Sequence, residues 1–168
     1  MDFENKTAVV TGAGSGIGRA TAQALAREGA HVIAADIDGA SGEASAAAIR
    51  AQGHQATFMH VDMTDAASIA AFAAAAQSQC GAIDVLVNAA GWGRTAPFVE
   101  GTPEFWNKLV ALNFVGPMTL AKALLPAMIE RAGGKIVNIA SDAGRVGSLG
   151  ETVYAGAKGG LIAFTKSL

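Results

Sequence analysis

Tyr154 and Lys158 are four residues apart, and Ser141 precedes the tyrosine by thirteen residues, at the end of the strand-like run Ile136–Ala140. Side chains four apart on a helix leave the same face. An unperturbed tyrosine, with a pKa of about 10, is a poor acid at neutral pH, and a neighbouring ammonium favours the phenolate form. A serine hydroxyl aimed at the same point would hold a carbonyl oxygen as charge develops on it. The three residues predict proton exchange with a carbonyl or hydroxyl oxygen, although Tyr-x-x-x-Lys alone is also typical of a solvated lysine beside a half-buried tyrosine.

A glycine-rich turn near the start of the chain is the second chemical signal. The short stretch Thr7–Val10 leads into TGAGSGIG at Thr11–Gly18, with the spacing G-x-x-x-G-x-G. Glycines let a backbone approach a pyrophosphate, and the helix that follows offers free N–H groups and the positive end of its dipole. The alternative is that the glycines only make a tight turn. The turn predicts a dinucleotide site with these contacts: Gly12, Ser15, Gly16, Ile17 and Gly18.

Two aspartates follow predicted strands. Asp36 closes the run His31–Ala35, about where an acid that receives a ribose 2′-hydroxyl is expected. Because a carboxylate repels a 2′-phosphate, Asp36 favours NAD over NADP, and the nearby Arg19 would partly offset that repulsion. Asp62, directly after Val61, would accept a hydrogen bond from an adenine amino group. Either aspartate is also suited to capping the turn after its strand.

Strands and helices alternate along the whole chain. Such alternation implies right-handed crossovers and a parallel sheet covered on both faces. The sequence predicts one Rossmann-type, doubly wound α/β domain over residues 1–168, with three layers, α/β/α. Gly116, Pro117 and Pro126 should bend or interrupt the long helix, and residues 141–150 are predicted as a loop. The predicted strands are 7–10, 31–35, 56–61, 83–87 and 135–140, and the predicted helices are 17–28, 40–52, 66–80, 103–131 and 152–168.

Composition excludes several function classes. The chain has 168 residues, of which 51% are hydrophobic and 15% charged, and its net charge is −2. These values predict a soluble folded domain with no electrostatic basis for binding nucleic acid or a membrane surface. The single cysteine, Cys80, and the three histidines, His31, His54 and His60, have no metal-ligand spacing. We therefore expect a cytoplasmic protein without a metal site.

With both motifs in place, the chain resembles the classical short-chain dehydrogenase/reductase family over essentially its whole length. The stretch Asn88–Gly91 is similar to the family's Asn-Asn-Ala-Gly segment, with Ala89 replacing the second asparagine. Asn113 matches the asparagine that interrupts the family's long helix. The resemblance implies an enzyme that acts on CH–OH groups.

The same resemblance implies a role for each candidate site residue. Ser141 would orient the substrate oxygen, and Tyr154 would exchange a proton with it. Lys158 would favour the ionised phenol and contact the nicotinamide ribose, while Asn113 would hold a water that links Lys158 to solvent. The cofactor would supply the hydride chemistry. The residues implied to line NAD, besides those of the glycine turn, are Asp36, Val61, Asp62, Asn88, Ala89, Gly91, Tyr154 and Lys158.

The implied reaction is the NAD-dependent interconversion of a secondary alcohol and a ketone. A narrower resemblance, to 2-hydroxycyclohexanecarboxyl-CoA dehydrogenases, is carried by the segments 136–147, 153–155, 91–92 and 97–98. It implies a cyclic hydroxyacyl-CoA substrate, for which Trp92, Val146 and Leu149 would suit the apolar ring. The alternatives are a 3-oxoacyl-[acyl-carrier-protein] reductase and a nucleotide-binding fragment without turnover. Family members pair through their long and catalytic helices, which implies a homodimer or homotetramer.

The sequence ends within the predicted catalytic helix. Members of the family continue through further strands and a segment that covers the substrate. We therefore expect the 168-residue chain to lack those last strands and to be less stable and less active than an extended version.

Overall fold

Five strands alternate with helices in the computed structural model, which describes residues 2–168. The order of elements agrees with the sequence prediction except where stated below. The elements are β1 (Thr7–Thr11), α1 (Gly16–Arg27), β2 (His31–Asp36), α2 (Gly39–Ala51), β3 (Ala56–His60), α3 (Ala66–Cys80), β4 (Val85–Asn88), η1 (Phe98–Glu100), α4 (Pro103–Val110), η2 (Ala111–Val115), α5 (Gly116–Glu130), β5 (Lys135–Asn138), α6 (Ala143–Val146) and α7 (Thr152–Ser167).

The strands form one parallel sheet in the order β3-β2-β1-β4-β5. The chain builds outward from β1 to β3 and then crosses to the other side of β1 for β4 and β5. The prediction of a doubly wound parallel sheet is therefore confirmed. The reversal point lies between β1 and β4, where ligands bind in open α/β sheets, beyond the carboxyl ends of the strands.

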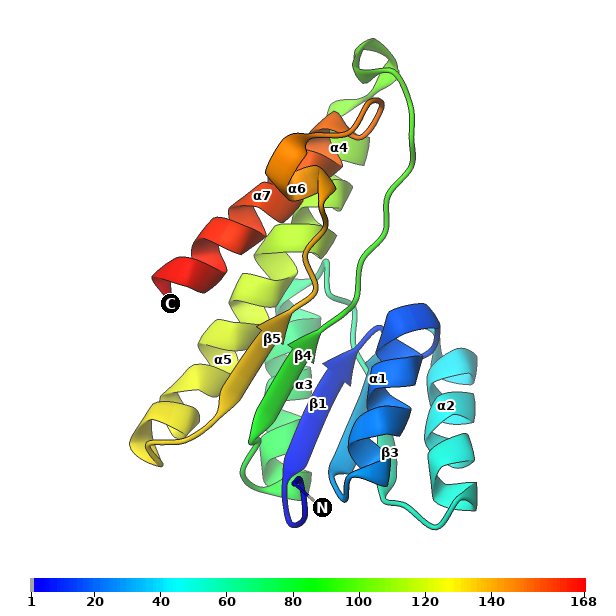
Figure 1. Ribbon diagram of the computed structural model, residues 1–168, viewed down its shortest axis with the longest axis vertical. Helices are drawn as coiled ribbons and strands as arrows, with labels where there is room; N and C mark the ends of the chain where they lie inside the picture. The colour runs from blue at the N-terminus through cyan, green and yellow to red at the C-terminus, as the bar shows by residue number, and fades with distance from the viewer. Residues whose placement is uncertain (1) are drawn as a thin grey trace.

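Helices cover both faces of the sheet (Figure 1). Alternate strand residues point to opposite faces, so Val10 and Val87 pack with α1 and α2, whereas Val9 and Leu86 pack with α3 and α5. The first face is rich in alanine, which lets α1 and α2 lie close to the sheet. The second carries larger side chains, among them Phe72, and continues to Phe164 of α7.

Local capping signals account for several helix starts. Asp65 caps α3 by accepting a hydrogen bond from the Ala67 N–H at 2.9 Å, and Thr102 caps α4 by accepting from Phe105 N–H at 3.3 Å. Gly81, with a φ of 72°, ends α3 as predicted. The sequence also offers Thr64, directly before Asp65, as a cap for α3, and this prediction is wrong because the Thr64 hydroxyl donates to Asp62.

The buried face of α1 differs from the prediction. The helical spacing of Ile17, Ala20, Thr21, Ala24 and Leu25 in the sequence predicts that these residues form the buried face, but the fully buried ones are Gly18, Ala22 and Ala26. The reason is close packing, since a Cβ at Gly18 would lie 2.1 Å from the Gly12 carbonyl oxygen. Only small side chains fit this contact, and Ile17 remains 62% exposed.

Three element boundaries also correct the prediction. β4 begins at Val85 rather than at Ile83, and β3 and β5 end earlier than expected, at His60 and Asn138. Ser141 therefore lies beyond the end of β5, and the predicted loop after it contains the short helix α6. No local composition signal distinguishes this single helical turn from a loop.

The long helix is interrupted, but by a π-helical turn, η2, directly before Gly116 and Pro117. Pro126 stays inside α5. The helical stretch Pro103–Glu130 contains an 18-residue window with the length and the mean hydropathy, 1.4, of a membrane span. Composition does not separate such a span from an interior helix, and here Leu109, Leu120 and Leu124 are buried.

A cluster around Asp84, the amino-end cluster, joins the strand starts to the end of α5. One carboxylate oxygen accepts from Thr7 N–H at 3.0 Å, and the other lies 3.4 Å from the Lys6 ammonium and 3.6 Å from an Arg131 nitrogen. Arg131 also donates to the Ile83 carbonyl at 2.8 Å. Each polar group in this cluster has a partner.

Candidate active site

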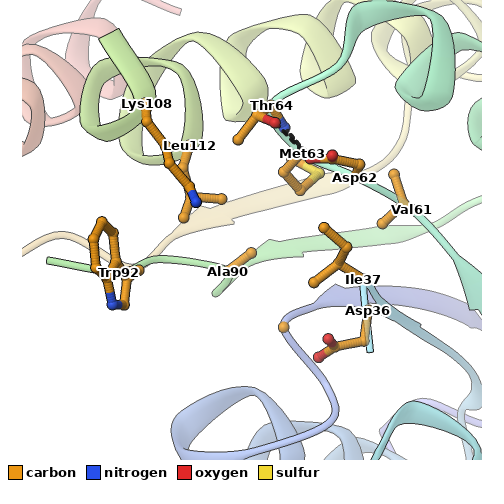
Figure 2. Close-up of a pocket in the computed structure, with 11 residues that line it drawn as sticks. Asp36, Ile37, Val61, Asp62, Met63, Thr64, Ala90, Trp92, Lys108 and Leu112 are labelled. Carbon is orange, nitrogen blue, oxygen red and sulfur yellow. Dashed lines mark hydrogen bonds between the residues drawn. The ribbon is translucent and has the colours of Figure 1, made fainter. Parts of the chain in front are cut away.

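A cavity of about 360 Å³ opens at the carboxyl ends of the strands. Figure 2 shows Lys108 and Leu112 reaching into it from one side, with Asp36 and Ile37 on the other. Four of its lining residues are predicted cofactor contacts: Gly12, Asp36, Val61 and Asp62. The cavity therefore lies where the sequence places a dinucleotide.

The glycine turn brings the start of α1 to this cavity. Gly12 has a φ of 67°, and a Cβ there would lie 2.8 Å from the Ala90 Cα, so only glycine fits. Ser15 is the N-cap of α1, but its side chain accepts no hydrogen bond from the first turn, whereas Asp38, Asp65 and Thr102 cap α2, α3 and α4. The N–H groups of α1 and the exposed Ser15 are thus open to an anion.

Asp36 stands beside the glycine turn at the end of β2. One carboxylate oxygen accepts from the Gly14 N–H at 2.7 Å, and the other accepts from the Asp38 N–H at 2.9 Å. Asp36 thus fixes both the glycine turn and the turn before α2. Each carboxylate oxygen retains a further lone pair for a ribose hydroxyl. Arg19 donates to the Gly14 carbonyl and to Ser45, which holds it against the same turn.

Asp62, two residues past β3, lines the cavity on the same side as Asp36, because β2 and β3 are neighbouring strands. One of its oxygens accepts from the Thr64 hydroxyl at 2.7 Å and from the Thr64 N–H at 2.8 Å. These two bonds lower the pKa of Asp62 below its usual range, with smaller contributions from the charges of His60 and Lys108. The second carboxylate oxygen is left for a donor such as an exocyclic amine.

Lys158 is the only charged side chain that is buried among residues 2–168, with 4% exposure. Its ammonium donates to the Ile139 carbonyl at 2.7 Å and lies 5.7 Å from the Tyr154 ring centroid, one helical turn away. Burial lowers the pKa of Lys158, because desolvation disfavours the charged form. The predicted pair therefore shares one face of α7.

Asn113 reaches the same region from the π turn η2. It is fully buried, and its amide nitrogen donates to the carbonyls of Trp92 and Leu109 at 2.8 and 2.9 Å. Its Oδ1 has no hydrogen-bond partner within the described chain. A Cβ built on Gly91 would lie 3.0 Å from that oxygen and 3.5 Å from the Lys158 Nζ, so both groups flank the backbone of Gly91.

Ser141 is held beside α7 by the short helix α6. Its Oγ accepts from the Ala143 N–H at 3.2 Å, which leaves the hydroxyl proton free to be donated. A Cβ at Gly144 would lie 2.7 Å from the Gly159 backbone nitrogen, so the two glycines let α6 press directly on α7 next to Lys158.

The predicted catalytic residues and the predicted cofactor contacts lie at one edge of the sheet. Some of the cofactor contacts differ in detail from the prediction. Gly16 and Ile17 are exposed at the start of α1, and Gly18 packs against Gly12. Asn88 is buried in the sheet and donates to Asn138, and the Ala89 N–H is occupied by the Thr11 hydroxyl at 3.1 Å. These two residues support the cavity wall.

Sequence reasoning missed several residues of the site. Thr11 accepts from the N–H groups of both Ala89 and Ala90, and so ties the segment after β4 to β1. Lys108 lines the cavity beside Trp92, which the sequence assigns to an apolar substrate ring, and the Lys108 ammonium lies 5.5 Å from the Trp92 ring. A hydroxyl at a strand end before a glycine turn is a usable signal for Thr11, but nothing local marks Lys108. Within residues 2–168, no cluster of histidine, cysteine or carboxylate groups is arranged to hold a metal ion.

Comparison with known proteins places the chain in a family. The sequence profile of the family described as short chain dehydrogenase matches residues 6–168. Galactitol 2-dehydrogenase of Agrobacterium fabrum is 45% identical over 99% of this chain and 64% of its own length. The 3-oxoacyl-[acyl-carrier-protein] reductase FabG of Vibrio harveyi is 40% identical over the whole chain and 68% of its own length.

Solved structures include a close match to the fold. The crystal structure of a metagenomic short-chain oxidoreductase in complex with NADP has a TM-score of 0.96 and 36% identity, covering 99% of this chain and 76% of that one. The chain spans between 61% and 68% of the length of curated relatives such as these.

Proposed function

The chain belongs to the short-chain dehydrogenase family, and we propose that the protein containing it is an NAD-dependent oxidoreductase that interconverts a secondary alcohol and a ketone. The observation that carries the proposal is the meeting of Tyr154, Lys158 and Asn113 around the segment after β4, next to a cavity with an uncapped helix start. A bound nicotinamide would supply the hydride chemistry.

The chain's own residues would handle the proton and the substrate oxygen. Ser141, which keeps its hydroxyl proton, would donate to the oxygen as charge develops on it. Tyr154 would exchange the proton with that oxygen, and the adjacent Lys158 ammonium, 5.7 Å from the centre of the ring, would stabilise negative charge that develops on the phenol oxygen. The unpartnered Asn113 Oδ1 would take a water that connects Lys158 to solvent.

The choice of NAD over NADP rests on Asp36. Its carboxylate is fixed at the cavity by Gly14 and Asp38, so it would not move aside for a 2′-phosphate. Arg19, which the sequence offered as compensation, is already engaged with the Gly14 carbonyl and Ser45. The metagenomic relative binds NADP, so a direct comparison of the two cofactors is the relevant measurement.

For the substrate, we propose a ketone or alcohol with an apolar ring, such as a cyclic hydroxyacyl-CoA. Trp92 lines the cavity with 45% of its surface exposed, and Val146 and Leu149, after Ser141, are 75% and 99% exposed. A 3-oxoacyl-[acyl-carrier-protein] reductase is the second candidate, since a relative with 40% identity carries that name. A homodimer or homotetramer and a cytoplasmic location stay predictions.

The decisive experiment is Tyr154→Phe in the natural protein carried to its own C-terminus. We expect kcat for NADH oxidation to fall by about 10²–10⁴-fold, because the proton donor is removed, with NADH binding unchanged by fluorescence titration. The panel covers cyclic ketones, their alcohols and 3-oxoacyl thioesters, each with NADH and NADPH.

Two results contradict the proposal. A Tyr154→Phe protein with full activity would exclude the assigned proton donor. A parent protein that binds NADH and turns over nothing in the panel would favour the alternative, a nucleotide-binding module without catalysis.

A further inference from the structure

Ser141 lies two residues before the short helix α6 and is bonded to its first turn. The Ala143 N–H donates to the Ser141 Oγ at 3.2 Å, and the Gly144 N–H donates to the Ser141 carbonyl oxygen at 3.0 Å. Both donors belong to α6. The Ser141 hydroxyl therefore follows any movement of α6.

The helix α6 lies against α7 through two glycines (Figure 1). A Cβ at Gly144 would lie 2.7 Å from the Gly159 nitrogen and from the Lys158 carbonyl carbon. From the other side, a Cβ at Gly159 would lie 3.0 Å from the Gly144 carbonyl oxygen. Neither glycine has a positive φ, so backbone conformation does not demand glycine at either position. The close approach of two backbones is what excludes a side chain here.

Of the two helices, α6 is the one that would yield to a side chain in this contact. It has four residues, and none of them is buried. In contrast, α7 has sixteen residues, of which Lys158 and Leu161 are buried, and the Lys158 ammonium donates to the Ile139 carbonyl at 2.7 Å. A methyl group between the helices would therefore push α6 outward together with Ser141, and would leave Tyr154 and Lys158 in place.

We propose that Gly144 and Gly159 are positioning residues, which set the distance between the Ser141 hydroxyl and the face of α7 that carries Tyr154. This inference rests on the proposed function, because it takes Ser141 as the donor to the substrate oxygen. It adds that contact between two backbones fixes the position of that donor. A donor stabilises developing charge only within hydrogen-bond distance, so the loss should fall on kcat.

The test compares Gly144→Ala and Gly159→Ala with the natural protein carried to its own C-terminus, using NADH and the ketone of the panel that is reduced fastest. We expect kcat to fall by about 10–10²-fold in Gly144→Ala, because a displacement of about 1 Å near the reacting atoms can cost that much. Gly159→Ala should lose less, about three- to tenfold, since its Cβ meets a more distant atom. The Kd for NADH, from fluorescence, should be unchanged in both variants.

A double variant separates positioning from a general loss of structure. In a Ser141→Ala background, Gly144→Ala should lower kcat by less than about twofold, because the hydroxyl that it displaces is already absent. The midpoint of the pH dependence of kcat should not move in Gly144→Ala, since Tyr154 and Lys158 stay together. If Gly144→Ala does not fold, Gly159→Ala takes its place in both measurements, because alanine is favoured over glycine within a helix such as α7.

The matched control is Gly156→Ala, also on α7, where a Cβ meets no atom within 4 Å and kcat should stay the same. A folded Gly144→Ala protein with full activity would overturn the inference, as would an equal loss with and without the Ser141 hydroxyl. A shifted pH midpoint would overturn it too, because α7 would then be the helix that moves. The proposed function would stand in these three cases, whereas a natural protein that reduces no ketone in the panel would overturn both.

Discussion

The two ends of the parallel sheet use polar groups in opposite ways. At the amino end, the Asp84 carboxylate, Arg131 and the Thr7 N–H satisfy one another. At the carboxyl end, Lys158 is buried without a carboxylate within salt-bridge distance, and the Oδ1 atoms of Asn88 and Asn113 have no partner in residues 2–168. The polar groups at the amino end stabilise the fold. The carboxyl end keeps buried polar groups that lower the stability of the fold and that a ligand can use.

This difference has an energetic meaning. A buried polar atom without a partner costs about 1–3 kcal/mol, and a desolvated ammonium costs more. The carboxyl end therefore lowers the stability of the fold, and the interactions at the amino end and in the two cores offset that cost. Substitutions at the carboxyl end should therefore mainly lower activity, and substitutions at the amino end should mainly lower stability.

The largest effect is expected from Lys158→Met. Removing the ammonium should lower kcat by about 10²–10⁴-fold, while the free energy of unfolding stays the same or rises by about 1 kcal/mol, because a buried charge is replaced by an apolar chain of similar length. NADH absorbance and urea unfolding measure the two quantities. A strongly destabilised Lys158→Met protein would contradict the difference between the two ends, since Lys158 would then stabilise the carboxyl end of the sheet as Asp84 stabilises the amino end.

Asp84→Ala should show the reverse pattern. The variant leaves the Thr7 N–H without its acceptor and removes the charge that faces Lys6 and Arg131, so we expect the free energy of unfolding to fall by about 2 kcal/mol with kcat within about twofold. Glu43→Ala is the control, because the exposed Glu43–Arg50 pair should contribute less than about 0.5 kcal/mol. If the two variants unfold at the same urea concentration, the amino-end cluster is not a stabilising feature.

Asp36→Asn tests whether a charge at the carboxyl end sets the preference between NADH and NADPH. Removing the charge at the cavity should raise the ratio of NADPH to NADH binding constants about tenfold, or about 1.4 kcal/mol. Asp62→Asn is a matched control, because the retained Oδ1 can still accept both bonds from Thr64 and the cofactor ratio should not change. Fluorescence titration with both cofactors checks this, and an equal shift in both variants would remove Asp36 from the discrimination.

The smallest effect concerns pH. Burial lowers the pKa of Lys158 in the folded state below the unfolded value, 10.5, so the unfolded chain binds the proton more tightly. The penalty is complete below the lowered pKa and is relieved as pH rises toward 10.5. The stability advantage of Lys158→Met over the natural protein should therefore shrink as the pH increases through that window. Urea unfolding in alkaline buffers measures it, and an advantage that grows with pH would contradict the cause given.

Features with local causes could be predicted from the sequence. The cap at Asp65 and the stop at Gly81 give α3 the predicted bounds, and the four-residue spacing places Tyr154 and Lys158 on one face. The parallel sheet could be predicted from the alternation of strands and helices along the chain. The strand and helix patterns are local, and the right-handed connection between parallel strands is a general rule.

Features that depend on distant partners could not be predicted. Lys108 of α4 lines the cavity together with residues that follow β2, β3 and β4, and no pattern around it in the sequence indicates this. The packing of α6 on α7 depends on the close contact between Gly144 and Gly159. In the sequence, neither glycine by itself indicates a contact with the other. The Asp36 bond to the Gly14 N–H joins two turns whose proximity exists only in the folded chain.

The π turn at Ala111–Val115 also constrains the length of the chain at this position. A π turn holds an extra residue compared with an α turn. Because the wide turn absorbs that residue, deleting it would restore a regular helix in which α4 and α5 keep their buried faces. The position from which the Asn113 amide donates to the Trp92 and Leu109 carbonyls would be lost with the wide turn. In the evolution of this helix, gaps should therefore be excluded from the five residues around Asn113 and tolerated in the loop that follows β4.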